Sequence, residues 1–100
     1  MYITAFITHK PEAAQARSEA QQAFRTYLHE HSAHPDVVVH HAGPTLADDG
    51  QNIVGLLLAM EAPSLDSARA FLDDSPYAKA DVFAECELRE WDWITGRPGQ

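Results

Sequence analysis

Runs of apolar and polar residues divide the chain into alternating strand-like and helix-like segments. Residues 2–8 are rich in β-branched and aromatic side chains and predict a first strand. Residues 37–41 predict a second strand, which Gly43-Pro44 ends. Residues 53–60 are apolar on both faces and predict a central third strand. Alternating apolar and polar side chains over 82–94 predict a fourth.

Two segments have helical spacing. From Pro11 to about His31, good helix formers surround a stripe of apolar residues three or four apart. Ser64 is expected to cap a second helix through its hydroxyl, and a short turn is expected over 76–80. The order β-α-β-β-α-β predicts an α+β ferredoxin-like sandwich, in which a four-stranded antiparallel sheet carries both helices on one face.

Length and charge narrow the classes of partner. The chain has 100 residues, so we expect one domain over 1–96 and a disordered C-terminal tail over 97–100. The net charge of −8, from 7 basic and 15 acidic residues, argues against nucleic acids and anionic membranes. The longest apolar run, 53–60, is too short to cross a bilayer, and the N-terminus lacks a signal-peptide pattern. We therefore expect a cytoplasmic protein.

The fourth strand indicates how the sheet is covered. Alternation places one set of side chains toward the helices: Val82, Ala84, Cys86, Leu88 and Ile94. The opposite set mixes charges with large aromatics: Phe83, Glu85, Glu87, Arg89, Trp91 and Trp93. Because two helices cover one face, we expect the second set to face away from them and to build a homodimer. The alternative is a solvated sheet face.

Several residues are candidates for chemistry. His9 follows the first strand. His40 and His41 are adjacent on the second strand, so their side chains are expected to point to opposite faces of the sheet. Arg17 is a candidate for holding an anionic substrate or for pairing with a nearby Glu. Cys86 is expected to be a small core residue. We expect no cofactor.

Three further histidines lie where the first predicted helix ends. His29 and His31 are two residues apart and do not share a helix face, so a metal site that included His34 would need the loop to fold back. We expect a solvated helix end and no metal.

The order and spacing of several weak signals resemble those of the YCII-related family of dimeric α+β barrel proteins. They are Tyr2 at the start of the first strand, Arg17 and Tyr27-Leu28 on the helix, Ala42-Gly43-Pro44, the apolar third strand, and Ser75-Pro76-Tyr77 with Ala80 and Val82. The resemblance implies a ferredoxin-like fold that pairs sheet to sheet into a dimer. It also implies a His on the first helix and an Asp before the Pro-Tyr pair; a related group acts as dehydrochlorinases on aromatic breakdown products.

This chain departs from that pattern. The helical His would fall at Ala20 or Phe24, and the Asp would fall at Ser75, with Asp74 one residue earlier. Neither Ala nor Phe is able to transfer a proton near neutral pH.

Two interpretations remain. The first is an enzyme that performs proton transfer or elimination on a small aromatic-derived or lactone-like molecule, in a cleft near the dimer interface. Its expected catalytic residues are His9 or His41 as base, oriented by Asp74 or Ser75, and its substrate-binding residues are Arg17, Arg89 and Trp91. The second is a non-catalytic dimeric ligand-binding or accessory module that has lost the His–Asp pair of the family.

Overall fold

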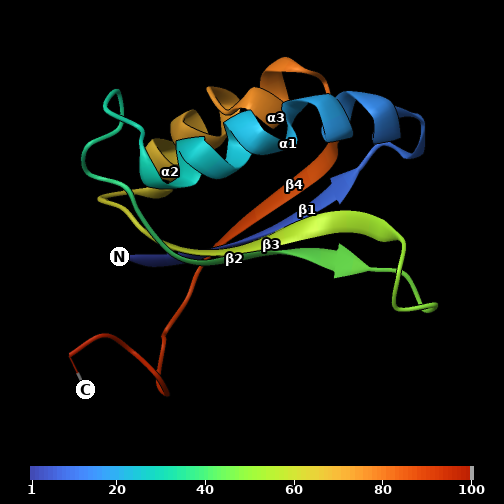
Figure 1. The fold of residues 1–100 in the computed structure, drawn as a ribbon. Helices are drawn as coiled ribbons and strands as arrows, with labels where there is room; N and C mark the ends of the chain where they lie inside the picture. The colour runs from blue at the N-terminus through green and yellow to red at the C-terminus, as the bar shows by residue number, and fades with distance from the viewer. Residues whose placement is uncertain (100) are drawn as a thin grey trace.

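The computed structural model describes residues 1–99 and has a sheet covered by helices on one side (Figure 1). Its elements are β1 (Tyr2–His9), a 3-10 turn (Pro11–Ala13), α1 (Ala14–His29), β2 (Val38–Leu46), β3 (Ile53–Glu61), α2 (Leu65–Asp73), α3 (Pro76–Lys79) and β4 (Phe83–Glu90). The four strands are antiparallel in the order β2-β3-β1-β4. This arrangement confirms the ferredoxin-like prediction.

The core lies between the sheet and the helices. Strand β1 turns Ile3, Ala5 and Ile7 toward the helices, because alternate side chains of a strand share a face. Their partners across β3 are Met60, Leu58 and Leu56, which are also buried. The apolar run that predicted a central strand is therefore central, with β1 and β2 on its two sides.

Serine side chains cap the N-termini of α2 and α3. The Ser64 hydroxyl accepts a hydrogen bond from the Ser67 amide at 3.0 Å, which confirms the predicted cap of α2. Ser75 performs the same role for α3 and also donates to the carbonyl oxygen of Leu72 at 2.6 Å. No helix within residues 1–99 combines the length and the apolar composition that are needed to cross a membrane.

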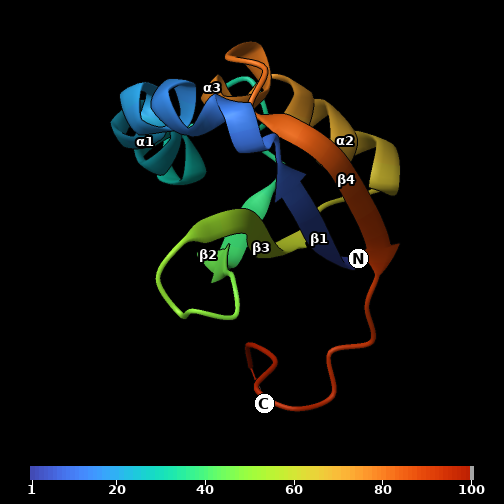
Figure 2. The ribbon, with the colours of Figure 1, turned by 90° about the vertical axis from the view of Figure 1, so that its right-hand side faces the viewer.

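Two predicted strand ends were wrong. Strand β2 continues through Gly43-Pro44 to Leu46; as an edge strand it tolerates a proline, which has no amide proton to donate. Strand β4 ends at Glu90 rather than at Ile94. The chain beyond it turns beneath the sheet, on the side away from the helices (Figure 2). Ile94, predicted for the core, is 71% exposed.

A register shift at the start of β4 reverses the predicted orientation of Phe83. Thr8 pairs with Glu85, but His9 pairs with Phe83, so β4 carries one extra residue at this point. Phe83 consequently lies on the helix side, where it stacks on His9. The prediction that Phe83 faces away from the helices was wrong for this reason, and Ala84, predicted for the core, is exposed.

A second shift in β2 lies between Val39 and His41. The rings of both His40 and His41 contact the Trp93 indole, with centroids 5.4 and 5.6 Å away. The prediction that these two histidines point to opposite faces was therefore wrong. Trp93 itself is buried beneath the sheet, and its indole nitrogen donates to the Thr95 carbonyl. Of the predicted tail 97–100, Gln100 lies outside the described residues, and disorder of the remainder stays a prediction.

Candidate functional site

His9 is the last residue of β1 and is enclosed by aromatic rings. Its side chain stacks on Phe83, with centroids 6.0 Å apart, and meets Tyr77 edge to face at 5.8 Å. The residue is 8% exposed, and neither ring nitrogen has a hydrogen-bond partner among residues 1–99. Burial, and then the positive charge of Arg17, lower the pKa of His9 from its ordinary 6.5. The imidazole is therefore neutral at pH 7 and keeps a free lone pair.

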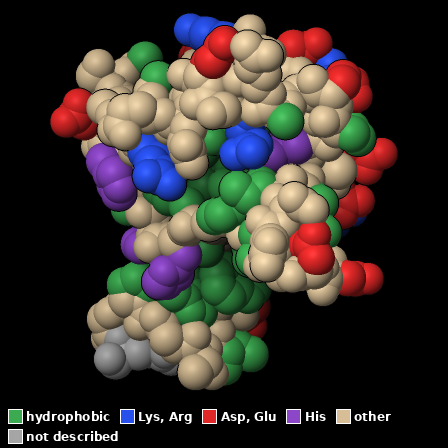
Figure 3. All heavy atoms as spheres, turned by 45° about the vertical axis from the view of Figure 1, so that its right-hand side comes forward, with side chains coloured by type: hydrophobic (Ala, Val, Ile, Leu, Met, Phe, Trp, Pro, Cys, Tyr) green, Lys and Arg blue, Asp and Glu red, His purple; other side chains and the backbone are tan. Residues whose placement is uncertain are grey.

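A hollow of about 210 Å³ lies beside His9, between α1 and strands β2 and β3; we call it the His9 hollow. Its lining is His9, Arg17, Gln21, Phe24, Arg25, Leu28, Ala42, Gly43, Pro44, Ile53, Gly55, Leu56 and Tyr77. A neighbouring hollow of about 360 Å³ shares His9 and Arg17 and includes Lys10. Figure 3 shows Lys and Arg side chains gathered over hydrophobic surface, with histidines around them.

Tyr77 adds a hydroxyl group to this site. Burial raises the pKa of Tyr77, while the charges of Arg17 and Arg25 partly oppose the rise. The phenol thus stays protonated at neutral pH and is able to donate a hydrogen bond. Sequence reasoning missed Tyr77 and Arg25 as site residues. The four-residue spacing from Arg17 through Gln21 to Arg25 was the signal that would have placed Arg25 on the same helix face.

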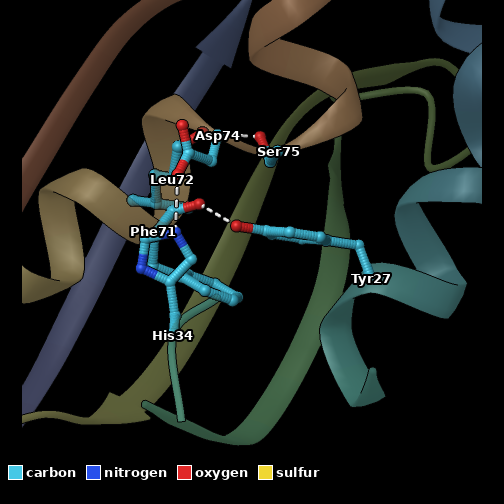
Figure 4. A network of polar contacts seen from close by, with 6 residues as sticks. All are labelled: Tyr27, His34, Phe71, Leu72, Asp74 and Ser75. Carbon is cyan, nitrogen blue, oxygen red and sulfur yellow. Dashed lines mark hydrogen bonds and ion pairs between the residues drawn. The ribbon is translucent and has the colours of Figure 1, made fainter. Parts of the chain in front are cut away.

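Asp74 and Ser75 lie in a different set of contacts (Figure 4). The Asp74 carboxylate is 2.7 Å from the Nε2 atom of His34, and the Ser75 hydroxyl donates to the Leu72 carbonyl. Neither residue lines the two hollows beside His9. The structure therefore does not bring them to His9, although Ser75 begins the short helix that carries Tyr77.

His41 and Trp91 lie on the sheet face away from the helices. Together with Phe6 and Leu57 they line a hollow of about 660 Å³, which we call the open-face hollow. Arg89 of β4 pairs with Thr4, which lines the open-face hollow, but Arg89 itself does not line it. The Arg89 guanidinium donates a hydrogen bond to the Leu88 carbonyl at 2.9 Å. The predicted site residues thus occupy separate places, and only Arg17 accompanies His9 in the His9 hollow.

His31 and Cys86 do not form part of a metal or nucleophile site among the described residues. Within residues 1–99, no three His, Cys, Asp or Glu side chains are grouped so that they could hold a metal ion. His31 contacts two backbone carbonyls. Cys86 is partly buried, and burial raises the pKa of its thiol, so little of it is the nucleophilic thiolate at pH 7.

Comparison with solved structures finds an enzyme that is similar to this chain over most of its length. The 5-chloro-2-hydroxyhydroquinone dehydrochlorinase TftG from Burkholderia phenoliruptrix, solved in complex with 2,5-dihydroxybenzoquinone, is 28% identical to this chain. The match covers 92% of this chain and 94% of TftG, with a TM-score of 0.77. No curated protein sequence matches the chain.

Two more distant structures share the fold alone. A dimeric ferredoxin-like protein of unknown function from Bacteroides fragilis is 10% identical, with 90% of this chain and 94% of that chain covered and a TM-score of 0.50. An Arabidopsis thaliana protein is 6% identical, with 96% and 97% covered and a TM-score of 0.55. The model of the YCII-related domain matches residues 1–92, so this chain belongs to the YCII-related family.

Proposed function

We propose that this protein is an enzyme that removes a proton from a small hydroxylated aromatic ring bound in the His9 hollow, with His9 as the base. The observation that carries the proposal is a buried, neutral imidazole whose ring nitrogens both lack a partner beside a cavity. Buried polar groups are nearly always hydrogen-bonded, so an unpartnered one calls for an explanation, and a catalytic role is one that fits a cavity beside it. The 28% identity to a dehydrochlorinase supports an aromatic substrate class.

Three polar residues of the His9 hollow have a task in this reaction. A ring nitrogen of His9 accepts the hydroxyl proton of the substrate. Tyr77 donates a hydrogen bond to a second ring oxygen, and the charge of Arg17 stabilises the oxyanion that forms. Phe24, Leu28 and Leu56 supply apolar contacts for a flat ring.

On a chlorinated hydroquinone, proton transfer of this kind leads to elimination. Loss of a hydroxyl proton lets the ring take up a proton at the chlorine-bearing carbon as its keto tautomer. Loss of a second hydroxyl proton then expels chloride as the carbonyl forms. Overall the ring loses one proton and one chloride ion and becomes a hydroxyquinone, without any external oxidant.

A second candidate is a non-catalytic dimeric module that binds a ligand. Two observations favour it: Asp74 is paired with His34, and no carboxylate of residues 1–99 lines the His9 hollow to orient His9. In this case the hollow binds a small molecule and leaves it unchanged.

Under either candidate we propose that the sheet face away from the helices pairs with a second copy of the chain. That face exposes 53% of Phe6 and 41% of Leu57, next to the open-face hollow. Exposed apolar surface of this kind is typical of interaction sites. The similarity to a Bacteroides fragilis protein described as dimeric is consistent with such a dimer.

The test is anaerobic release of chloride from 5-chloro-2-hydroxyhydroquinone, followed with a chloride electrode. We expect wild-type release above buffer, and a fall of roughly 10²- to 10⁴-fold in His9→Gln, because the variant lacks the base. His41→Gln tests the other predicted base and is expected to leave the rate unchanged.

The matched control is His29→Gln, which removes an exposed imidazole from the end of α1. Wild-type release no faster than buffer, or full activity in His9→Gln, would overturn the catalytic proposal. Binding of 2,5-dihydroxybenzoquinone without any chloride release would favour the non-catalytic module.

A further inference from the structure

Helix α1 presents a row of polar side chains to the His9 hollow. Arg17, Gln21 and Arg25 are four residues apart in sequence, so they follow one another along one face of the helix. All three line the hollow. Opposite them, Pro44 and Leu56 provide an apolar floor. A ligand in this space therefore meets positive charge on one side and hydrocarbon on the other.

Neither arginine has a carboxylate partner in the part of the chain that the structure describes. The ion pairs found there join Lys10 to Asp81, His34 to Asp74 and His40 to Glu61. None of the 15 acidic residues lines the His9 hollow. The whole chain carries a charge of −8, so this local excess of positive charge has the opposite sign to its surroundings.

The positive charges of Arg17 and Arg25 both act on the Tyr77 hydroxyl. Both Arg17 and Arg25 oppose the rise in the pKa of Tyr77 that burial causes, so both fields reach the Tyr77 hydroxyl. Arg17 lies at the His9 end of the row, and Arg25 lies at the rim, where it also lines the next hollow along α1. An acidic group that enters past Arg25 is thus attracted toward Tyr77.

We propose that Arg25 and Arg17 form an anion-binding subsite, so that the ligand of the His9 hollow is a flat ring carrying a carboxylate or an ionised hydroxyl group. Guanidinium groups suit this task because they stay charged and present paired N–H donors to carboxylate oxygens. This inference rests on the proposed function in that the ligand occupies the same hollow. It does not require His9 to act as a base.

Benzoate and benzamide provide a matched pair of probes, since they share ring and shape and differ in charge. Their dissociation constants are measured by titration of ¹⁵N-labelled protein and the chemical shifts of its amide signals. We expect wild-type protein to bind benzoate roughly tenfold more tightly than benzamide, the effect of about one charge-assisted hydrogen bond. Added salt is expected to weaken benzoate binding and to leave benzamide binding unchanged.

Variants locate the charge that matters. Arg25→Gln is expected to weaken benzoate binding by roughly tenfold and to leave benzamide unaffected. Arg25→Lys retains part of the preference because it keeps the charge and loses the paired donors. The control is Arg69→Gln, which removes the same charge from an exposed position on α2 and is expected to change neither affinity.

The outcomes separate this inference from the proposed function. If His9→Gln abolishes chloride release and still prefers benzoate, both stand. If no chloride is released by any variant while the preference for benzoate depends on Arg25, the subsite stands and the reaction falls. Equal affinity for the two probes, no binding of either by the wild type, or equal effects of Arg25→Gln and Arg69→Gln would overturn the subsite.

Discussion

His9 and His31 are two sheltered imidazoles on either side of α1 in the chain, and their surroundings are opposite. The Nδ1 atom of His31 is 2.7 Å from the carbonyl oxygen of Tyr27, and its Nε2 atom is 2.7 Å from that of Val37. His9 has no partner on either nitrogen. The polar contacts of His31 connect the end of α1 to the chain before β2, whereas His9 makes no hydrogen bond with residues 1–99. The polar capacity of His9 is therefore not used within the described part of the fold.

The contrast extends to the neighbours of each histidine. Around His31, Tyr27 donates to the Phe71 carbonyl and His34 pairs with Asp74, so the polar side chains of Figure 4 have partners within the fold. Around His9, Arg17 and Arg25 line a hollow to which no carboxylate of residues 1–99 contributes. Similar residue types thus hold the loop after α1 together at one place, while at the other the two nitrogens of His9 have no hydrogen-bond partner among residues 1–99.

The largest expected effect comes from His31→Leu. Removing the imidazole removes the hydrogen bond that its ring N–H donates to one of the two carbonyl oxygens, and an unsatisfied partly buried group costs about 1–3 kcal/mol. We expect the free energy of unfolding to fall by about that amount in urea titrations followed by circular dichroism. The control His29→Leu alters an exposed residue and is expected to stay within about 0.5 kcal/mol. Equal losses in both variants would break the comparison.

Tyr27→Phe is expected to have a smaller effect. It removes the hydrogen bond to the Phe71 carbonyl, worth about 1 kcal/mol. Burial, assisted by the charge of Asp74, also raises the pKa of Tyr27 to about 12 from 10.0. The unfolded phenol ionises first as the pH rises, so wild-type stability falls between about pH 10 and pH 12.

In Tyr27→Phe this part of the alkaline loss of stability is expected to disappear. The matched variant Tyr2→Phe is expected to keep it. Urea midpoints at pH 9 and pH 11 measure the difference, and an unchanged alkaline slope in Tyr27→Phe would contradict the assignment.

His9→Leu is expected to change stability least, and in the opposite direction. No hydrogen bond is lost, and an unpartnered buried polar group becomes apolar, so the free energy of unfolding at pH 7 rises by up to about 1 kcal/mol. Because burial lowers the pKa of His9, the unfolded chain binds a proton below about pH 6.5 before the folded one does. Wild-type stability therefore falls with acidification, and His9→Leu removes that portion.

Urea midpoints of both proteins at pH 7 and pH 5 test this sign. A loss of stability in His9→Leu at pH 7 would mean that His9 has a structural role like that of His31. The opposite responses of His9→Leu and His31→Leu are the sharpest statement of the comparison.

The sequence predicted the architecture because its signals are local. The apolar run 53–60 is a central strand, Ser64 caps α2, and the helical stripe from Pro11 begins as a 3-10 turn that leads into α1. Each depends on periodicity or on a hydrogen bond to a near neighbour. The position of His9 at the end of the first strand also brought it to the candidate site.

The remainder depended on features that no local pattern records. One extra residue in β4 turned Phe83 toward His9, and a shift in β2 brought His40 and His41 to one indole. Asp74 is drawn to His34, 40 positions away in sequence. Bulges and distant polar partners are fixed by packing of the whole domain, so spacing alone misplaced these side chains.

Because Trp93 is buried under the sheet, the tryptophan fluorescence of the protein reports on the sheet face away from the helices. The chain contains 2 tryptophans, and Trp91 stacks on Trp93 with centroids 4.9 Å apart, both away from the helices. Intrinsic emission therefore senses whether the last strand's extension is docked, displaced or pressed against another molecule. Neither tryptophan lines the His9 hollow, so this emission reports on the sheet face away from the helices rather than on that hollow.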